Sequence, residues 1–312
     1  MQYDQTISNP RPSQGIQCRR RCAATKIELR NDKTLAGNIA ALQDVKSLQN
    51  LRLSGTQVSG DLAAFRKLKH LEELRLGSTR VTGDVAALQN LKRLRVVQLR
   101  RTKVTGNMTV LKDLRELREL HLHNTRVVGD LSGIVHAEHL KILHLRHTQI
   151  QGDIMDLQDL RWLRKLWLCK TSVRGSIKAV QNLKYLTQLS LVDTKVDGDL
   201  TAVQDLNNLF VLSLSNTNVE GDLRSIRNLG KLQELKLTNT KVEGSIAALQ
   251  DLTSLKTLSL GNTRVTGEIA VVMQLDHLEL LDLAGTAVTG WISAIWNGCC
   301  KKLRKVNLAV LG

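Results

Sequence analysis

Leucine and other apolar residues recur along this chain in one repeating pattern. The unit reads L-x-x-L-x-L-x-x-T-x-V-x-G-D-[LIV]-x-A-L-x-x-L-x-x, and one copy contains Leu48, Leu51, Leu53 and Thr56. In the x-L-x-L-x segment, leucines alternate with other residues. This alternation predicts a short strand whose leucines point into a core while the intervening residues occupy the opposite face.

The repeat has a constant length of 23 residues, marked by a threonine and by a glycine four positions after it. The threonines are Thr56, Thr79, Thr102, Thr125, Thr148, Thr171, Thr194, Thr217, Thr240, Thr263 and Thr286. We expect each threonine to be buried at the turn after the strand, where its hydroxyl satisfies backbone groups. The glycine supplies a positive φ or a close backbone approach. The following aspartate, such as Asp61, is placed to cap a short helical turn over residues 62–68.

A period of this size with an L-x-x-L-x-L core resembles the leucine-rich repeat. The V-x-G-D-L stretch is most similar to the plant-type class, whose unit carries L-x-G-x-I, although threonine stands here where that class has asparagine and its proline is missing. The resemblance covers residues 27 to about 308. It implies an α/β solenoid, curved as a right-handed superhelix, with a parallel concave β-sheet and short helical or irregular convex segments. We count 13 strand cores from residue 27 to residue 308, and V-x-G-D-L is a candidate second, lateral strand.

Both ends of the chain deviate from the repeat, as terminal repeats do. Lys33 stands where a threonine would be, and the spacing from Gly290 to Leu308 exceeds the internal value by two residues. We therefore divide the chain into a basic N-terminal tail or cap (1–26), the repeats (27–290) and a C-terminal capping repeat (291–312). Trp291 and Trp296 are expected to cover the last open core.

The composition is that of a soluble globular protein, with 42% hydrophobic and 24% charged residues. No run of about 18 uncharged apolar residues predicts a membrane span, and residues 1–17 lack the apolar region of a secretory signal. The five cysteines are too sparse for a disulfide framework, which favours free thiols in a reducing compartment; a Cys18–Cys22 bridge is the alternative. We expect a soluble intracellular protein. An organelle address stays open, and secretion is not favoured.

Charge is distributed unevenly along the chain. Residues 1–178 contain 32 Lys and Arg against 16 Asp and Glu, and the remaining residues contain 13 of each, so the formal net charge of +16 lies in the first part. There the outward strand positions of repeats two to seven hold Arg, His and Trp. Arg and Trp are typical of binding hot spots, and a basic surface of this kind attracts an acidic partner. The candidate partner-binding residues are Arg52, Arg75, Gln98, Arg100, Arg101, His121, His123, His144, Arg146, His147, Trp167 and Lys170. The alternative is a solvated face with no partner.

Four histidines, His121, His123, His144 and His147, should come close together on neighbouring strands. Such a cluster could hold zinc, but no nearby carboxylate is evident to orient the rings, so partner contact is the preferred interpretation. We predict no metal and no cofactor. No phosphate-binding loop, dinucleotide fingerprint or hydrolase motif occurs, so an enzyme is not expected.

Three functions fit these features. The preferred one is a protein-protein interaction module, an adaptor, scaffold or assembly subunit, whose partner has an acidic docking surface. The first alternative is binding to nucleic acid or another anionic surface through the basic N-terminal half, although aromatic residues for base stacking are scarce. The second is an extracellular ligand-binding protein of receptor or inhibitor type, which the plant-type resemblance implies.

Overall fold

The computed structural model describes residues 6–7, 24–290 and 302–308. It contains two compact units, residues 1–152 and 153–312, and each is described by itself. Several sequence predictions lie outside the described residues: those on Cys18, Cys22, Trp291, Trp296, Cys299, Cys300 and most of both terminal segments.

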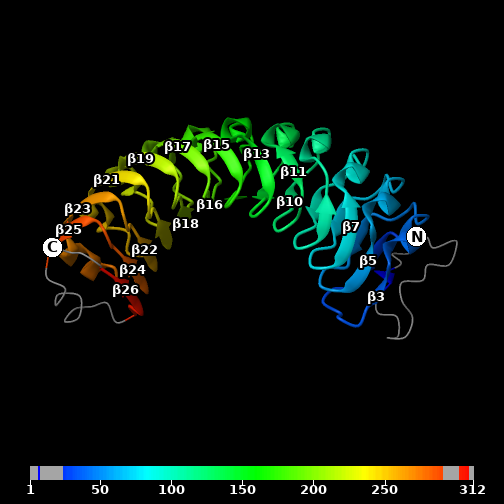
Figure 1. Cartoon of the computed structure of the whole chain (residues 1–312), viewed down its shortest axis with the longest axis horizontal. Helices are drawn as coiled ribbons and strands as arrows, with labels where there is room; N and C mark the ends of the chain where they lie inside the picture. Colours follow the sequence, from blue (N-terminus) through cyan, green and yellow to red (C-terminus); the bar gives the residue numbers. More distant parts are fainter. Residues whose placement is uncertain (1–5, 8–23, 291–301, 309–312) are drawn as a thin grey trace, which may run out of the picture. The chain divides into compact units, whose positions relative to one another are not determined.

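Unit 1 is a stack of coils, each of which contributes one strand to a parallel inner sheet (Figure 1). A short strand β1 (Thr6–Ile7) pairs with β2. The strands that follow the repeat are β2 (Lys26–Glu28), β4 (Asn50–Arg52), β6 (Glu73–Arg75), β8 (Val96–Gln98), β10 (Glu119–His121) and β12 (Ile142–His144). From β4 to β12 each residue lies beside the residue 23 positions later; between β2 and β4 the offset is 24, because Lys26 is opposite Asn50.

Unit 2 repeats this arrangement. Its inner strands are β14 (Lys165–Trp167), β16 (Gln188–Ser190), β18 (Val211–Ser213), β20 (Glu234–Lys236), β22 (Thr257–Ser259), β24 (Leu280–Asp282) and β26 (Lys305–Asn307). The offset is again 23 until the last pair, where Leu280 lies opposite Lys305. Apart from β1, the two units therefore contain the thirteen strand cores predicted from the sequence.

A second strand follows each inner strand from β2 to β24, as the V-x-G-D-L stretch predicts. In unit 1 these are β3 (Ala36–Asn38), β5 (Gln57–Asp61), β7 (Arg80–Asp84), β9 (Lys103–Thr105), β11 (Val128–Asp130) and β13 (Gln149–Asp153), which ends at the unit boundary. In unit 2 they are β15 (Ser172–Ser176), β17 (Lys195–Asp199), β19 (Asn218–Asp222), β21 (Lys241–Ser245), β23 (Arg264–Glu268) and β25 (Ala287–Thr289).

Short 3-10 helices complete the coils. They are η1 (Ile39–Leu42), η2 (Leu62–Phe65), η3 (Val85–Leu88), η4 (Met108–Leu111) and η5 (Leu131–Ile134) in unit 1. In unit 2 they are η6 (Ile154–Leu157), η7 (Ile177–Val180), η8 (Leu200–Val203), η9 (Leu223–Ile226), η10 (Ile246–Leu249) and η11 (Ile269–Gln274). The predicted helical turn over residues 62–68 is thus shorter, ending at Phe65. No helix among the described residues is long and apolar enough to cross a bilayer.

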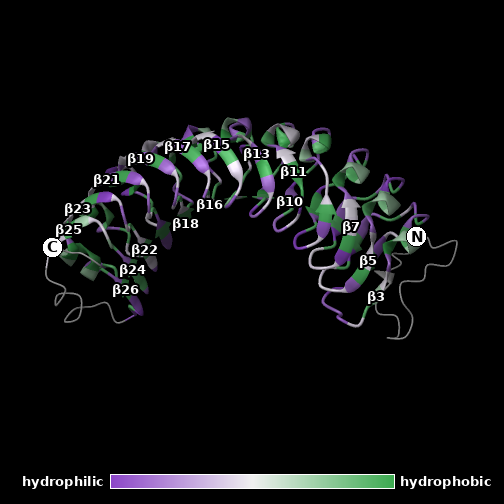
Figure 2. Ribbon diagram, viewed as in Figure 1, coloured by the Kyte–Doolittle hydropathy of each residue, from purple (hydrophilic) through white to green (hydrophobic). Residues whose placement is uncertain are grey.

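The core is a column of aliphatic side chains enclosed by every coil. Leu74, Val97, Leu120 and Leu143 occupy equivalent strand positions and have no exposed surface. Figure 2 shows the resulting change between hydrophobic and hydrophilic positions along successive strands. Because leucine and its relatives fill this column, the fold needs few aromatic residues, which make up 3% of the chain.

The cap and the glycine of neighbouring coils are packed together. The Asp61 carboxylate accepts a hydrogen bond of 2.7 Å from the Ala63 amide and caps η2. Gly83, in the next coil, has a φ of +102°, and a Cβ there would lie 2.4 Å from Asp61 Oδ1. The glycine is therefore required both for its backbone angle and for its closeness to the cap.

Each repeat threonine is buried, as predicted, and closes the turn after its strand. The Thr217 hydroxyl, for example, donates a hydrogen bond of 2.6 Å to the Leu214 carbonyl three residues earlier. Comparable bonds of 2.5 to 2.8 Å occur from Thr56 to Thr286.

Replacement of Thr217 by Val should therefore lower stability by about 1–2 kcal/mol, because the buried Leu214 carbonyl loses its donor while the side-chain volume is kept. The midpoint of urea unfolding, followed by circular dichroism, measures the effect. Thr217→Ser retains the hydroxyl and should cost clearly less; an equal loss in both variants would mean that the methyl group, not the hydrogen bond, matters.

Candidate functional site

One row of outward side chains crosses unit 1. The strand register places Arg52 beside Arg75, Arg75 beside Gln98, Gln98 beside His121, and His121 beside His144. Beyond the strands, backbone hydrogen bonds from Arg101 to His123 and from Asn124 to Arg146 continue the same pairing. We call this surface the strand face of unit 1; it comprises that row together with Arg100, Arg101, His123, Arg146 and His147.

The first coils of the strand face are electrically compensated. Arg52 contacts Glu28 at 3.3 Å and Glu73 at 2.5 Å, and Arg75 pairs with Glu73 and, at 3.5 Å, with Glu119. Ion pairs therefore link glutamates and arginines in one series of alternating charge: Glu28, Arg52, Glu73, Arg75 and Glu119. The predicted basic surface is narrower than expected, because Arg52 and Arg75 are already engaged by carboxylates within the same sheet.

Glu73 is the buried centre of this network, with 7% of its surface exposed. Burial by itself raises the pKa of its carboxyl, but hydrogen bonds from Arg52 and Arg75 outweigh that effect, so the pKa lies below its usual value. At the edge of the network, hydrogen bonding by Arg30 and Lys26 lowers the pKa of Glu28 to about 2. These ion pairs consequently persist over the whole neutral range.

Beyond this network, the strand face carries uncompensated positive charge. No carboxylate of the described residues lies within ion-pair distance of Arg100, Arg101 or Arg146. Arg101 and Arg146 are exposed, and Arg100 is half-buried. These three cations therefore remain available to an external acidic group.

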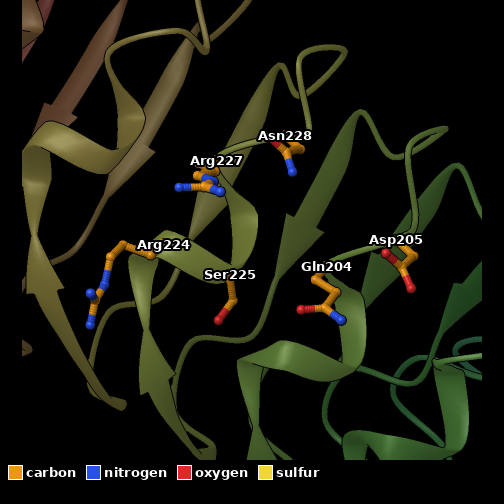
Figure 3. A pocket seen from close by; sticks show the side chains of 6 residues that line it. All are labelled: Gln204, Asp205, Arg224, Ser225, Arg227 and Asn228. Atoms are coloured by element: carbon orange, nitrogen blue, oxygen red, sulfur yellow. The ribbon is translucent and has the colours of Figure 1, made fainter.

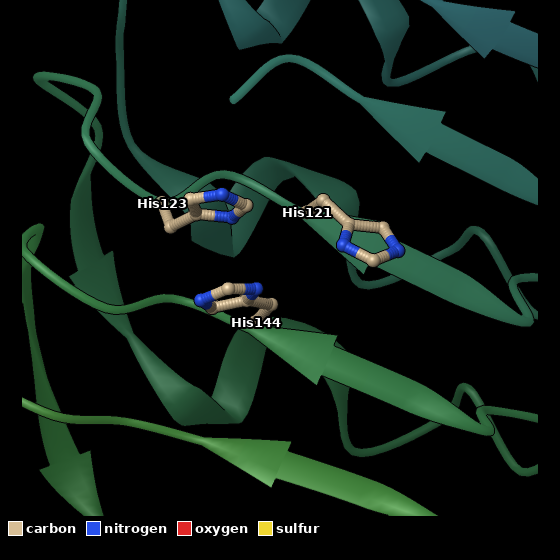
Figure 4. Close-up of side chains that lie close together, drawn as sticks. All are labelled: His121, His123 and His144. Carbon is tan, nitrogen blue, oxygen red and sulfur yellow. The ribbon is translucent and has the colours of Figure 1, made fainter. Parts of the chain in front are cut away.

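Three of the four predicted histidines do come together (Figure 4). The rings of His123 and His144 are stacked, with centroids 3.6 Å apart and planes 17° from parallel. The His121 ring lies across their edge, 6.3 Å from His123 and 6.1 Å from His144. His123 is buried, with 9% of its surface exposed, and the other two are half-buried.

The environment of the stacked pair keeps both rings neutral. Burial, and then the charges of His121 and neighbouring arginines, lowers the pKa of His123 to about 4. Burial, with His123, His121 and the arginines, lowers that of His144 to about 3. The sequence prediction that no carboxylate approaches the rings is wrong, since Glu119 Oε2 lies 3.6 Å from His121 Nε2. Glu119 and His121 are two positions apart on one strand, so the E-L-H spacing contained this signal.

Three of the candidate residues have an unusual backbone. Arg101, His147 and Lys170 have φ values of 53–54°, a left-handed conformation that is costly for such side chains. At the same repeat position unit 2 has Asn216, Asn239 and Asn262, which accept this conformation readily. The asparagines also bond in series: Asn239 donates to Asn216 at 2.6 Å, and Asn262 donates to Asn239 at 2.8 Å.

Trp167 and Lys170 belong to unit 2 and are described apart from the strand face of unit 1. Trp167 is half-buried on β14, where it lies beside Ser190, and Lys165 Nζ is 5.4 Å from the centre of its ring. Lys170 is exposed.

A second aromatic feature of unit 2 was missed in the sequence. Trp162 and Tyr185 stack with ring centroids 5.0 Å apart, and each has 48% of its surface exposed. They are 23 residues apart, so the period alone would have placed them side by side.

An open depression of about 510 Å³ also lies beside η8 and η9 (Figure 3). Its described lining is Gln204, Asp205, Arg224, Ser225, Arg227 and Asn228, which includes no histidine or cysteine.

Comparison with solved structures extends over most of the chain. The plant peptide hormone receptor RGFR1 in complex with RGF2 is 22% identical, with a TM-score of 0.69 over 88% of this chain and 53% of that one. The LRR ectodomain of the receptor kinase GASSHO1/SCHENGEN3 from Arabidopsis thaliana, with CASPARIAN STRIP INTEGRITY FACTOR 2, is 26% identical, with a TM-score of 0.76 over 92% and 38%. An internalin from Listeria monocytogenes is 23% identical, with a TM-score of 0.66 over 92% and 87%.

The chain is a leucine-rich-repeat protein. It spans about half of the RGFR1 chain and less of the GASSHO1 chain. No protein-family model and no curated protein matches the sequence. The solenoid of this leucine-rich-repeat protein is a fold typical of protein or peptide binding.

The left-handed backbone of Arg101 generates the second prediction. Arg101→Asn should stabilise the protein by about 0.5–1 kcal/mol, because asparagine tolerates this conformation and can accept a hydrogen bond from Asn124. Arg100→Asn removes the same charge at a position without a positive φ and is the matched control. Thermal unfolding compares the two; a gain of equal size in Arg100→Asn would attribute the effect to charge.

The neutral histidines generate the third prediction. In the unfolded chain both imidazoles regain their ordinary pKa near 6.5, whereas in the fold they stay neutral to about pH 4 and 3. The stability contributed by the pair should therefore be fully present at pH 7 and above, and it should be lost as the pH falls through 6.5 toward the folded pKa values. Between pH 7 and pH 5 the loss should be on the order of 2 kcal/mol for the pair after allowance for partial exposure. Urea unfolding at both pH values, with a chelator present, measures this loss.

The double variant His123→Asn, His144→Asn should flatten this part of the pH profile. Groups near the rings, namely His121, Arg100, Arg101 and Arg146, are unchanged in it, so the difference between the two profiles isolates the stacked pair. Parallel profiles for wild type and double variant would contradict the assignment.

Proposed function

We propose that this leucine-rich-repeat protein is a non-enzymatic binding module that holds a protein or peptide partner on the strand face of unit 1. The observation that carries the proposal is the group formed by Arg100, Arg101 and Arg146, which have no carboxylate partner among the described residues, beside neutral imidazoles. Guanidinium groups bind carboxylates in paired hydrogen bonds, so the partner should present an acidic surface.

The backbone supports the same surface. Arg101 and His147 occupy a left-handed position that asparagine fills at lower cost in unit 2. A residue that raises the free energy of the fold in this way is often retained for what its side chain does. Gln98, His121, His123 and His144 complete the proposed contact area, whereas Arg52 and Arg75 mainly stabilise the sheet through their glutamates. Trp167 and Lys170 are proposed as contacts of unit 2.

Binding to nucleic acid is the second candidate, and one observation favours it. The exposed stack of Trp162 and Tyr185 has the exposed Arg161 and Arg164 next to it in sequence. Exposed aromatic rings beside cations are suited to stacking on single-stranded bases. Such binding would weaken steeply with salt and would be lost from Trp162→Ala, whereas a shape-complementary protein contact on unit 1 would keep more of its affinity.

The fourth prediction tests the strand face by charge reversal. Arg100→Glu, Arg101→Glu and Arg146→Glu together should abolish capture of the partner from the native source, because each replaces an attraction with a repulsion. The matched control is Arg80→Glu, Lys103→Glu and Arg126→Glu, which are exposed positions of unit 1 outside the strand face. The control has the same net charge and should retain the partner.

Captures are quantified by mass spectrometry with and without nuclease. A protein that is lost only from the strand-face variant, and is insensitive to nuclease, supports the proposal. Equal yields from wild type and the strand-face variant, or equal loss from both variants, would overturn it. Loss on nuclease treatment together with loss from Trp162→Ala would favour the second candidate.

A further inference from the structure

The three histidines of the strand face have the composition of a metal site. Each offers one ring nitrogen, and these nitrogens all lie within 4.8 Å of one another. Nitrogen ligands of a tetrahedral zinc ion lie about 2.0–2.1 Å from the metal and therefore about 3.4 Å from each other. The described nitrogens are therefore farther apart than in an occupied site. Binding requires the stacked rings of His123 and His144 to tilt so that their nitrogens converge with that of His121.

Two ring nitrogens of this cluster, His121 Nε2 and His123 Nδ1, are buried without a hydrogen-bond partner. Such buried polar atoms are uncommon, because each forfeits its hydrogen bond to water. In Figure 4 one nitrogen of His121 faces the stacked pair and the other points away from it. Nε2 is the nitrogen 3.6 Å from the Glu119 carboxylate.

From this geometry we propose that His121, His123 and His144 together bind one divalent transition-metal ion of the zinc class, with Glu119 orienting His121. A carboxylate that receives the second N–H of a ligating imidazole is the usual support of such sites. Three imidazoles leave a fourth coordination position free for water or an anion. The inference does not depend on the proposed partner.

The donor set favours a transition metal. The set is purely imidazole, which suits zinc, copper and nickel and offers nothing to magnesium or calcium.

The arginines around the histidines weaken the binding of a metal cation and favour an anion as its fourth ligand. Arg100, Arg101 and Arg146 act on the same rings, and Arg75 acts on Glu119. A dication is therefore repelled by the guanidinium groups, which lowers its affinity below that of a site without them. The same groups attract an anion to the free position, so the bound metal should carry hydroxide, chloride or a carboxylate there.

The fifth prediction concerns metal affinity, measured by calorimetric titration of the full chain with Zn²⁺ alone. Thiols elsewhere in the chain are removed by Cys18→Ser, Cys22→Ser, Cys169→Ser, Cys299→Ser and Cys300→Ser in every protein compared. One Zn²⁺ should bind per chain, and His123→Ala or His144→Ala should each weaken binding at least about tenfold. The control His136→Ala, His139→Ala removes two exposed histidines of unit 1 and should leave affinity unchanged.

Glu119 is tested separately as a positioning residue. Glu119→Gln should weaken Zn²⁺ binding about tenfold, whereas Glu116→Gln, an exposed glutamate on the same coil, should not. Cobalt substituted for zinc provides a second readout, because a tetrahedral histidine site gives a visible absorption that Zn²⁺ displaces.

Equal Zn²⁺ affinity in wild type and the His123→Ala, His144→Ala double variant would overturn the proposal, as would Mg²⁺ binding as tight as Zn²⁺ binding. If these variants do not fold, modification of the wild type by diethyl pyrocarbonate decides the question. Zn²⁺ should then protect His121, His123 and His144 selectively, and equal modification with and without the metal would refute the site. Loss of the proposed protein partner leaves all these readouts unaffected.

Discussion

The structure depends on one constraint: within each unit, the inner strands from β4 to β12 and from β14 to β24 pair in parallel with the strand of the next coil at a constant offset of 23 residues. Parallel pairing at a fixed offset brings equivalent positions into contact, so a preference at one position is repeated in every coil. Leucines then meet leucines in the core, and each threonine closes its own turn. The aspartate caps can approach the next coil only because a glycine lies over them.

On the strand face of unit 1, this stacking places arginines in two different settings, with and without a neighbouring glutamate. Glu73 lies between Arg52 and Arg75, and this buried network belongs to the stability of the sheet. From the next coil onward, Arg100, Arg101 and Arg146 lie beside imidazoles that burial keeps neutral. Arginine therefore occurs in two settings on one sheet: Arg52 and Arg75 pair with glutamates, whereas no carboxylate of the described residues pairs with Arg100, Arg101 or Arg146.

The fold could be predicted from the sequence almost completely, because period, alternation and capping are local signals that the stacking repeats. The row from Arg52 to His144 followed from the period in the same way. What the sequence reading missed lies in the side chains. Glu73 and Glu119 lie two positions before Arg75 and His121 on the same strands, outside the columns from which the binding surface was predicted. The prediction therefore did not include the pairing of Arg75 with Glu73 or the approach of Glu119 to His121. The asparagines of unit 2 indicated a left-handed backbone and hence the cost at Arg101. The stacking of His123 on His144 depends on rotamers and burial, which no spacing specifies.

The terminal coils show what the constraint leaves free. Lys26 pairs with Asn50 and Leu280 with Lys305, so these coils contain 24 and 25 residues while their strands keep the alignment of the others. In the first of these coils the extra residue is accommodated by a connecting segment and does not shift the rows of side chains. A designer could lengthen a connection, or insert a foreign epitope or a cysteine for labelling there, and leave the surface chemistry of the strands intact. Contour length and surface pattern are, in this architecture, separately adjustable.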